Sequence, residues 1–168
     1  AARALTVRLT PRVFSHAYRM LGDRAEAEDV AQEAMIRLWK IAPDWRQGEA
    51  KVTTWLYRVV ANLCTDRLRK VRGIALDAVA EPEDDARGPV ESLQEQARMD
   101  ALQAALNRLS DRQRQAVVLR HIEGLGNPEI AGIMEISVEA VESLTARGKR
   151  ALAAELAGQR EALGYADG

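Results

Sequence analysis

The sequence is poor in the side chains that carry most catalytic and metal chemistry. It contains one cysteine, Cys64, and two histidines, His16 and His121, in 168 residues. A single thiol forms no intramolecular disulfide, and a cysteine-based zinc cluster needs several more thiols. Neither histidine has an acidic or serine partner at the spacing of a known catalytic motif, so we predict a protein that is not an enzyme and holds no metal or cofactor. We interpret Cys64 as a small buried side chain, because it stands within an apolar helical pattern.

Long uncharged apolar runs are also missing. No stretch long enough to cross a bilayer is free of charge, and residues 1–12 lack the apolar run of a secretory signal. We therefore expect a cytoplasmic protein with no membrane insertion. Apolar residues nevertheless make up 47% of the chain, which is enough for one ordinary core or two small ones.

Charge is distributed unevenly along the chain although the formal net charge is only −1. Residues 1–75 hold 14 Lys and Arg against 8 Asp and Glu, residues 76–100 hold 2 against 8, and residues 101–168 hold 8 against 9. The outline is a basic module, an acidic connector and a nearly neutral module. The small net charge argues against a protein that grips DNA along its whole length.

The spacing of apolar residues predicts an all-α fold. Apolar residues recur at intervals of three and four, and strict alternation over a strand length is absent. One break, from Pro43 to Gly48, is a short polar loop, and the other contains Glu81 to Asp85 and is too acidic to bury a core. We predict two small helical domains, residues 1–72 and 91–168, joined by a flexible acidic linker over residues 73–90.

Capping signals delimit the helices of the first domain. Asp23 followed by Glu26 predicts the start of a helix that runs to about Ile41, and Thr53 is a possible cap for a long helix through Arg72. On this long helix, Arg58, Asn62, Thr65 and Arg69 follow one another at spacings of four, three and four, so they form one exposed ridge.

Two surfaces of this domain each allow two interpretations. The loop with Trp45, Arg46 and Gln47 beside Arg58 and Asn62 has the groups needed to stack on and hydrogen-bond an unpaired base. The alternative is a solvated helix face beside a core tryptophan. The acidic face with Asp29 and Glu33 is, by itself, an ordinary wet surface.

The second domain has the pattern of a helix-turn-helix. Ser110 with Gln113 predicts the start of a helix that Gly124 stops, and Asn127 before Pro128 predicts the start of a short second helix. Ser137 then caps a longer third helix, from Val138 to about Leu156, after a tight turn. Such a pair of helices is the geometry that lays a recognition helix in the DNA major groove.

Three capped helices also form bundles that never meet DNA, so the charges on the third helix matter. Arg147, Lys149 and Arg150 are placed to reach phosphates, which favours DNA binding. Glu139 and Glu142 oppose it, although carboxylates do accept hydrogen bonds from cytosine amino groups.

Three segments together resemble the extracytoplasmic-function (ECF) sigma factors of the sigma-70 family. GDRAEAEDVAQEAMIRLWK, residues 22–40, is similar to the family's core-binding helix. TTWLYRVVANLCTDRLRK, residues 53–70, is similar to its minus-ten element. The segment LSDRQRQAVVLRHIEGLGNPEIAGIMEISVEAVESLTARGKRAL, residues 109–152, resembles its C-terminal minus-thirty-five domain.

The resemblance implies an alternative sigma factor that directs promoter-specific initiation, responds to stress or another signal and is held by an anti-sigma factor. It implies core RNA polymerase, promoter DNA and that inhibitor as partners, and the fold of sigma region 2 followed by sigma region 4. The implied polymerase-binding residues are Asp29, Gln32, Glu33, Arg37 and Trp39. The implied minus-ten residues are Trp45, Arg46, Gln47, Lys51, Trp55, Arg58, Asn62 and Arg69. The implied minus-thirty-five residues are Arg112, Arg114, Ser137, Glu139, Ala140, Glu142, Ser143, Arg147, Lys149 and Arg150.

The chain departs from the family at positions where the resemblance implies contact with DNA. It has Glu142 where Lys is frequent, Leu144 where Arg is common, and Val52 where Phe is usual. The promoter sequences of better-known relatives therefore do not transfer to it. Two other hypotheses are a stand-alone helix-turn-helix regulator, which leaves the first domain unexplained, and a helical adaptor with no DNA role. Binding to core polymerase separates all three.

Overall fold

The computed structural model describes residues 2–41, 49–75 and 93–162, and every regular element within these ranges is a helix. The first part holds α1 (Ala2–Leu21), α2 (Arg24–Ile41) and α3 (Glu49–Ala75). The second part holds α4 (Leu93–Asn107), α5 (Asp111–Val117), the π-helical turn η2 (Val118–Ile122), α6 (Asn127–Met134) and α7 (Val138–Ala162). The predicted all-α fold is confirmed for these residues.

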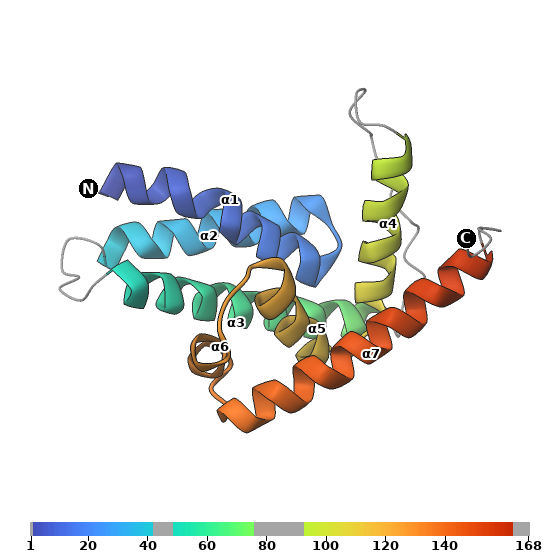
Figure 1. Cartoon of the computed structure of the whole chain (residues 1–168). Helices are drawn as coiled ribbons and strands as arrows, with labels where there is room; N and C mark the ends of the chain where they lie inside the picture. Colours follow the sequence, from blue (N-terminus) through green and yellow to red (C-terminus); the bar gives the residue numbers. More distant parts are fainter. Residues whose placement is uncertain (1, 42–48, 76–92, 163–168) are drawn as a thin grey trace.

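The helices α1, α2 and α3 lie side by side as a bundle (Figure 1). Between α1 and α2 the chain turns at Gly22, whose φ of 69° suits a residue without a β carbon. Asp23 then caps α2, because its Oδ1 accepts a hydrogen bond from the Glu26 backbone N–H at 3.0 Å. The buried stripe of α2 runs from Ala27 to Leu38 and faces the other two helices.

The helix-turn-helix forms from α5 and η2, α6 and α7. Ser110 Oγ accepts from the Gln113 backbone N–H at 3.3 Å, and Ser137 Oγ accepts from the Ala140 N–H at 3.1 Å, so both predicted caps are confirmed. Gly124 ends the first helix with a φ of 75°. Glu135 ends α6 in the left-handed region, at a φ of 58°.

Several predicted boundaries are wrong. The long helix begins at Glu49, before Thr53, and continues through Ala75, so residues 73–75 of the predicted linker are helical. Asn127 is the first residue of α6, and Gly126 stands at the cap position without a side-chain bond. The third helix of the second domain extends to Ala162 because its regular pattern continues past Leu156. The predicted polar loop at 43–48 and the linker from residue 76 on lie outside the described residues.

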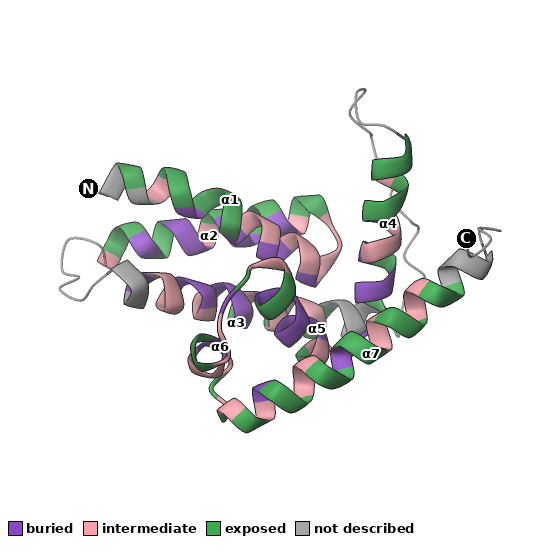
Figure 2. Ribbon diagram, viewed as in Figure 1, coloured by how far each residue is buried: buried purple, intermediate pink, exposed green. Residues whose placement is uncertain are grey.

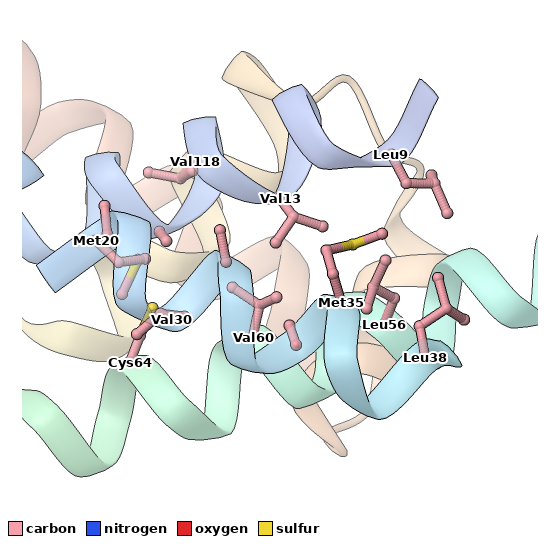
Figure 3. Packing of buried hydrophobic residues seen from close by; sticks show 14 of the residues in the cluster. Leu9, Val13, Met20, Val30, Met35, Leu38, Leu56, Val60, Cys64 and Val118 are labelled. Carbon is pink, nitrogen blue, oxygen red and sulfur yellow. The ribbon is translucent and has the colours of Figure 1, made fainter. Parts of the chain in front are cut away.

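The two domains pack against each other. The main core joins α1, α2 and α3 and also includes Leu106, Val117 and Val118 from the second half of the chain. In Figure 3, Val118 points into the same cluster as Val13 and Met20 of the first domain. Cys64 is buried in this core, as predicted, and burial raises the pKa of its thiol to about 12.

A second core forms where α3 meets the helix-turn-helix. Tyr57 and Ala61 of α3 are buried together with Leu119, Leu125, Ile130, Ile133 and Val141. Tyr57 is therefore a side chain of the first domain that completes the core of the second. None of the described helices has both the length and the apolar character needed to cross a bilayer.

Candidate polymerase and nucleic-acid interfaces

The face of α2 that points away from the bundle is exposed over most of its length (Figure 2). Asp29, Gln32 and Arg37 are exposed, and Glu33 is half-buried and accepts from Arg37 at 3.2 Å. Trp39 is a large apolar side chain left 53% exposed. The structure therefore brings the five residues implied as the polymerase site onto one side of one helix.

A groove of about 640 Å³ runs beside this face, between α1 and α2. The residues that line it include Phe14, Gln32, Met35, Ile36 and Trp39. The Trp39 indole N–H donates to Thr6 Oγ1 at 2.9 Å, which ties the ring to α1 while leaving much of it exposed. Val7, also on α1, is 69% exposed. Exposed apolar side chains next to a groove are typical of a protein interface.

Arg67 of α3 contacts acidic side chains of α2 and was not predicted as a site residue from the sequence. Its guanidinium donates to Glu26 and lies 3.9 Å from Asp29 Oδ2. The bond to Glu26, followed by the field of that carboxylate and of Asp29 and Glu33, raises the pKa of Arg67. Arg67 stands seven residues, or about two helical turns, after the buried Val60, and this spacing could have indicated that Arg67 lies on the inner side of α3.

The predicted ridge on α3 is only partly free. Asn62 and Arg69 are exposed, whereas Arg58 is half-buried and Trp55 packs against the main core. Arg58 Nη2 donates to the Gly132 carbonyl of α6 at 2.6 Å. The side chain of Lys51 and the whole of residues 45–47 lie outside the description, so the loop half of the predicted minus-ten site stays a prediction.

The amino-terminal half of α7 presents polar side chains on the surface. Ser137, Glu139, Glu142 and Ser143 are exposed and Ala140 is half-buried, as a recognition helix requires. The three cations that follow, Arg147, Lys149 and Arg150, and Arg112 on α5 are exposed as well.

Arg114 does not join these cations. Its side chain is buried and donates to the Met20 carbonyl of α1 and, at 3.0 Å, to the Asn107 carbonyl. The assignment of Arg114 to a DNA surface is therefore wrong for this arrangement, because its face of α5 packs on α1. Arg114 stands three residues before the buried Val117, and this spacing could have indicated that Arg114 shares the buried face of α5.

A polar cluster between the domains was also missed. Tyr57 Oη donates to Glu123 Oε1 at 2.7 Å, Ser15 Oγ lies 3.5 Å from Glu123 Oε2, and Arg12 stacks over the Tyr57 ring. His16 packs against the same ring and is fully buried. Burial raises the pKa of Glu123 and lowers that of His16 to about 4.

His121, the second histidine of the chain, lies in the π-helical turn η2 and is exposed. Partial burial, followed by the neighbouring cations Lys149 and Arg120, lowers its pKa. Lys149 and Arg120 are both exposed beside it. Arg120 also steadies the turn by donating to the Leu125 carbonyl at 3.2 Å.

Comparison with known proteins assigns both domains. Residues 5–74 match the family model of sigma-70 region 2, and residues 99–152 match that of sigma-70 region 4. A protein with these two regions in this order has the architecture of a sigma-70-type transcription initiation factor.

Curated relatives narrow the class. The chain is 35% identical over 156 residues to the ECF RNA polymerase sigma factor SigW of Bacillus subtilis, covering 86% of this chain and 83% of SigW. It is 36% identical over 147 residues to the ECF sigma factor SigE of Mycolicibacterium smegmatis, covering 84% of this chain but only 56% of SigE. The chain belongs to the ECF family of RNA polymerase sigma factors.

Solved structures agree on the fold. The sigma factor RpoE of Bartonella quintana, solved with the anti-sigma factor NepR, superposes with a TM-score of 0.76 at 21% identity, covering 92% of this chain and 95% of RpoE. CnrH, solved with the cytosolic domain of CnrY, gives a TM-score of 0.68 at 22% identity, covering 94% of this chain and 88% of CnrH.

Proposed function

We propose that this chain is an alternative sigma factor that brings core RNA polymerase to a restricted set of promoters. The observation that carries the proposal is the presence of region 2 and region 4 in order on one chain. A stand-alone helix-turn-helix regulator would need only the second of these and would normally pair two copies on a symmetric site.

The polymerase-docking surface in this proposal is the exposed face of α2 together with the groove beside it. Trp39 and Ile36 supply apolar area, and Gln32 and Asp29 supply hydrogen-bonding groups around it. An exposed aromatic ring surrounded by polar groups is the usual composition of the centre of a protein interface. The implied occupant is the clamp helices of the polymerase's largest subunit.

The promoter-reading surfaces are the α3 ridge with the loop before it and the start of α7. Region 2 has Arg58, Asn62 and Arg69 for the minus-ten element, with Trp45 to Gln47 in the loop as further candidates. Region 4 has Glu139, Glu142 and Ser143 toward bases and Arg147 to Arg150 toward phosphates. Control by an anti-sigma factor is part of the proposal, supported by the partners named for RpoE and CnrH.

A binding titration with purified core polymerase tests the docking surface. Trp39→Ala should weaken binding by about tenfold or more, because truncating an aromatic side chain at the centre of an interface removes most of its local contribution. Met99→Ala is the matched control, since Met99 is also a large exposed apolar side chain but lies on α4.

The full chain must bind core polymerase for the proposal to stand. If the unmodified chain shows no binding, the proposal fails outright. If Trp39→Ala and Met99→Ala bind equally well, the chain is a sigma factor whose docking surface lies elsewhere.

A further inference from the structure

The start of α7 carries two exposed carboxylates and no cation. Residues 136–146 contain no Lys, Arg or His, and no Asn or Gln. Glu139 and Glu142 are exposed three positions apart on the outer side of the helix, whereas Val141 is buried in the second core. In Figure 1, α7 begins beside α6 at the edge of the molecule. The half of α7 that the helix-turn-helix geometry directs into the major groove therefore presents mainly hydrogen-bond acceptors.

Neither carboxylate is neutralised within the protein. Among the described residues, no side chain forms an ion pair or a hydrogen bond with the carboxylate of Glu139 or Glu142. The helix offers no such partner, because its cations begin at Arg147, five positions after Glu142. An ion pair on a helix surface needs a spacing of three or four. Both groups are therefore available to a ligand outside the chain.

Helix stability accounts for Glu139 but not for Glu142. Glu139 lies in the first turn of α7, where the helix dipole favours a negative charge. That effect is confined to the first turn, and Glu142 stands four residues after Val138, the first residue of the helix. Glu142 thus lies on the surface proposed to read bases without a contact that stabilises α7.

A carboxylate that enters the major groove is penalised unless a base donates a hydrogen bond to it. The duplex carries about one negative charge per 1.7 Å of its axis, and a carboxylate in contact with a base edge loses hydration. Guanine presents two acceptors in this groove and thymine presents one acceptor. Cytosine presents a donor, its N4 amino group, and adenine presents a donor beside an acceptor. Cytosine is therefore the base that best satisfies a carboxylate.

The neighbouring side chains do not reverse this preference. Thr145 donates its hydroxyl proton to backbone carbonyls of α7, and Ser137 Oγ is engaged in the helix cap. Ser143 is exposed, and its hydroxyl pairs with donors and acceptors alike. Arg and Lys, the usual partners of guanine, are absent from this stretch until Arg147.

We propose that α7 selects cytosine in the minus-thirty-five element, with Glu142 accepting a hydrogen bond from cytosine N4 and Glu139 supporting it one turn earlier. This inference rests on the function proposed above and names the base that its region 4 surface selects. Specificity then comes largely from rejection, because any other base leaves a charged acceptor without a matching donor. The exposed cations from Arg147 onward hold the adjacent phosphates.

Run-off transcription by core polymerase and the full chain, from promoters randomised in the minus-thirty-five element, tests the inference. Products of the wild type should be enriched about fivefold or more in cytosine, on one strand, at one or two base pairs. Glu142→Gln should lose the enrichment at one of these positions and gain adenine there. The reason is that an amide both accepts from adenine N6 and donates to N7.

Glu155→Gln is the matched control. It makes the same change of charge on the same helix, about 20 Å along the axis from Glu142. It removes only an ion pair with Arg108, whose side chain is 72% exposed, and such surface pairs contribute little to stability. Its base preferences should equal those of the wild type.

A modified base tests the hydrogen bond itself. N4-methylcytosine still pairs with guanine, but its methyl group replaces the N4 hydrogen that faces the major groove. At the selected position it should lower transcription by the wild type about fivefold or more, as a wrong base does. Its effect on Glu142→Gln should be smaller, because that variant no longer depends on cytosine N4.

Four results would overturn the inference: selected promoters without a cytosine preference, a preference that Glu142→Gln leaves unchanged, the same shift in Glu155→Gln, or an equal response of wild type and Glu142→Gln to N4-methylcytosine. Failure of the proposed function gives a different result, since no promoter in the library would then yield a product that depends on the chain.

Discussion

His16 is a titratable side chain sealed inside the molecule. It is fully buried against the Tyr57 ring, and neither ring nitrogen has a hydrogen-bond partner among the described residues. A charged imidazole in such a place would lose its hydration without compensation, which is why burial lowers its pKa from 6.5 to about 4. The native protein therefore keeps His16 neutral under conditions that protonate it in the unfolded chain.

The position of this pKa predicts loss of stability in acid. Above pH 6.5 His16 is neutral in both states. As the pH falls from 6.5 toward 4, only the unfolded state takes up a proton on His16, so the free energy of unfolding decreases across that window. The shift corresponds to about 3 kcal/mol. The check is urea unfolding from pH 7 to pH 4 for the wild type and His16→Met, whose flexible apolar side chain fills a similar space.

The comparison between the two proteins isolates His16 from Glu123. Burial raises the pKa of Glu123, so this carboxyl takes up a proton in the native state first and opposes the effect of His16. Because both proteins retain Glu123, the difference between their unfolding free energies reports His16 alone. A difference that does not change between pH 7 and pH 4 would show that the imidazole is accessible to protons in the native protein.

The sequence predicts the hydrogen-bond partners of some side chains and not of others. The caps at Asp23, Ser110 and Ser137 depend on a backbone group three residues away, so the local pattern is sufficient. Arg58 and Arg114 find their partners 74 and 94 positions away. The spacing of Arg114 from Val117 indicates burial, but no local pattern identifies the Met20 carbonyl as the partner of Arg114 or Glu123 as the partner of Tyr57.

Among the helices, α7 depends on a close approach to α5. A β carbon on Gly148 would lie 2.5 Å from Val117 Cγ2 and 3.2 Å from the Gln113 carbonyl oxygen. Val117 belongs to the main core, so it has little room to move. The glycine lets the recognition helix lie against the rest of its domain.

This close approach predicts opposite effects for two glycines on one helix. Gly148→Ala should lower the free energy of unfolding by about 1–3 kcal/mol through overpacking. Gly158→Ala should raise it by up to about 1 kcal/mol through helix propensity, since nothing lies within 4 Å of the added methyl group. Thermal and urea unfolding of both variants provide the measurement. Similar changes in both variants would mean that α7 does not pack on α5 as described.

The two halves of α7 should act differently on promoters. Arg147→Ala is expected to weaken all promoters by a similar factor, because a phosphate contact carries no sequence information. Glu142→Lys should instead change which minus-thirty-five sequences are used, because the Glu142 carboxylate accepts hydrogen bonds from bases whereas a lysine ammonium only donates them. Transcription from a panel of minus-thirty-five variants distinguishes them. Equal effects of both substitutions on every promoter would refute this division of α7.

Element types were predictable from the sequence more reliably than their ends. The helical periodicity of α2, α3 and α7 extends over many residues, so their existence follows from the sequence. The start of α3 at Glu49 does not, because Thr53 offers a plausible cap that the fold leaves inside the helix. Packing of α3 on both domains outweighs that local signal.

At the scale of the whole molecule, two modest surfaces have to act together. The net charge of the chain is −1, so the chain as a whole lacks the positive field of a protein that binds DNA tightly along its whole length. Polymerase that holds both domains at promoter spacing raises the effective concentration of each for its element. The order of the domains was predictable from sequence resemblance. Their packing against each other was not, because it depends on contacts across the linker.

Run-off transcription with purified core polymerase tests the central claim, that this chain gives the enzyme its promoter specificity through two spaced contacts. The account predicts products only when the chain is added, from a subset of a promoter library. Those products should be lost when the spacing between the two elements changes by about half a helical turn, roughly 5 base pairs. Absence of any product that depends on the chain, or products indifferent to that spacing, would contradict the account.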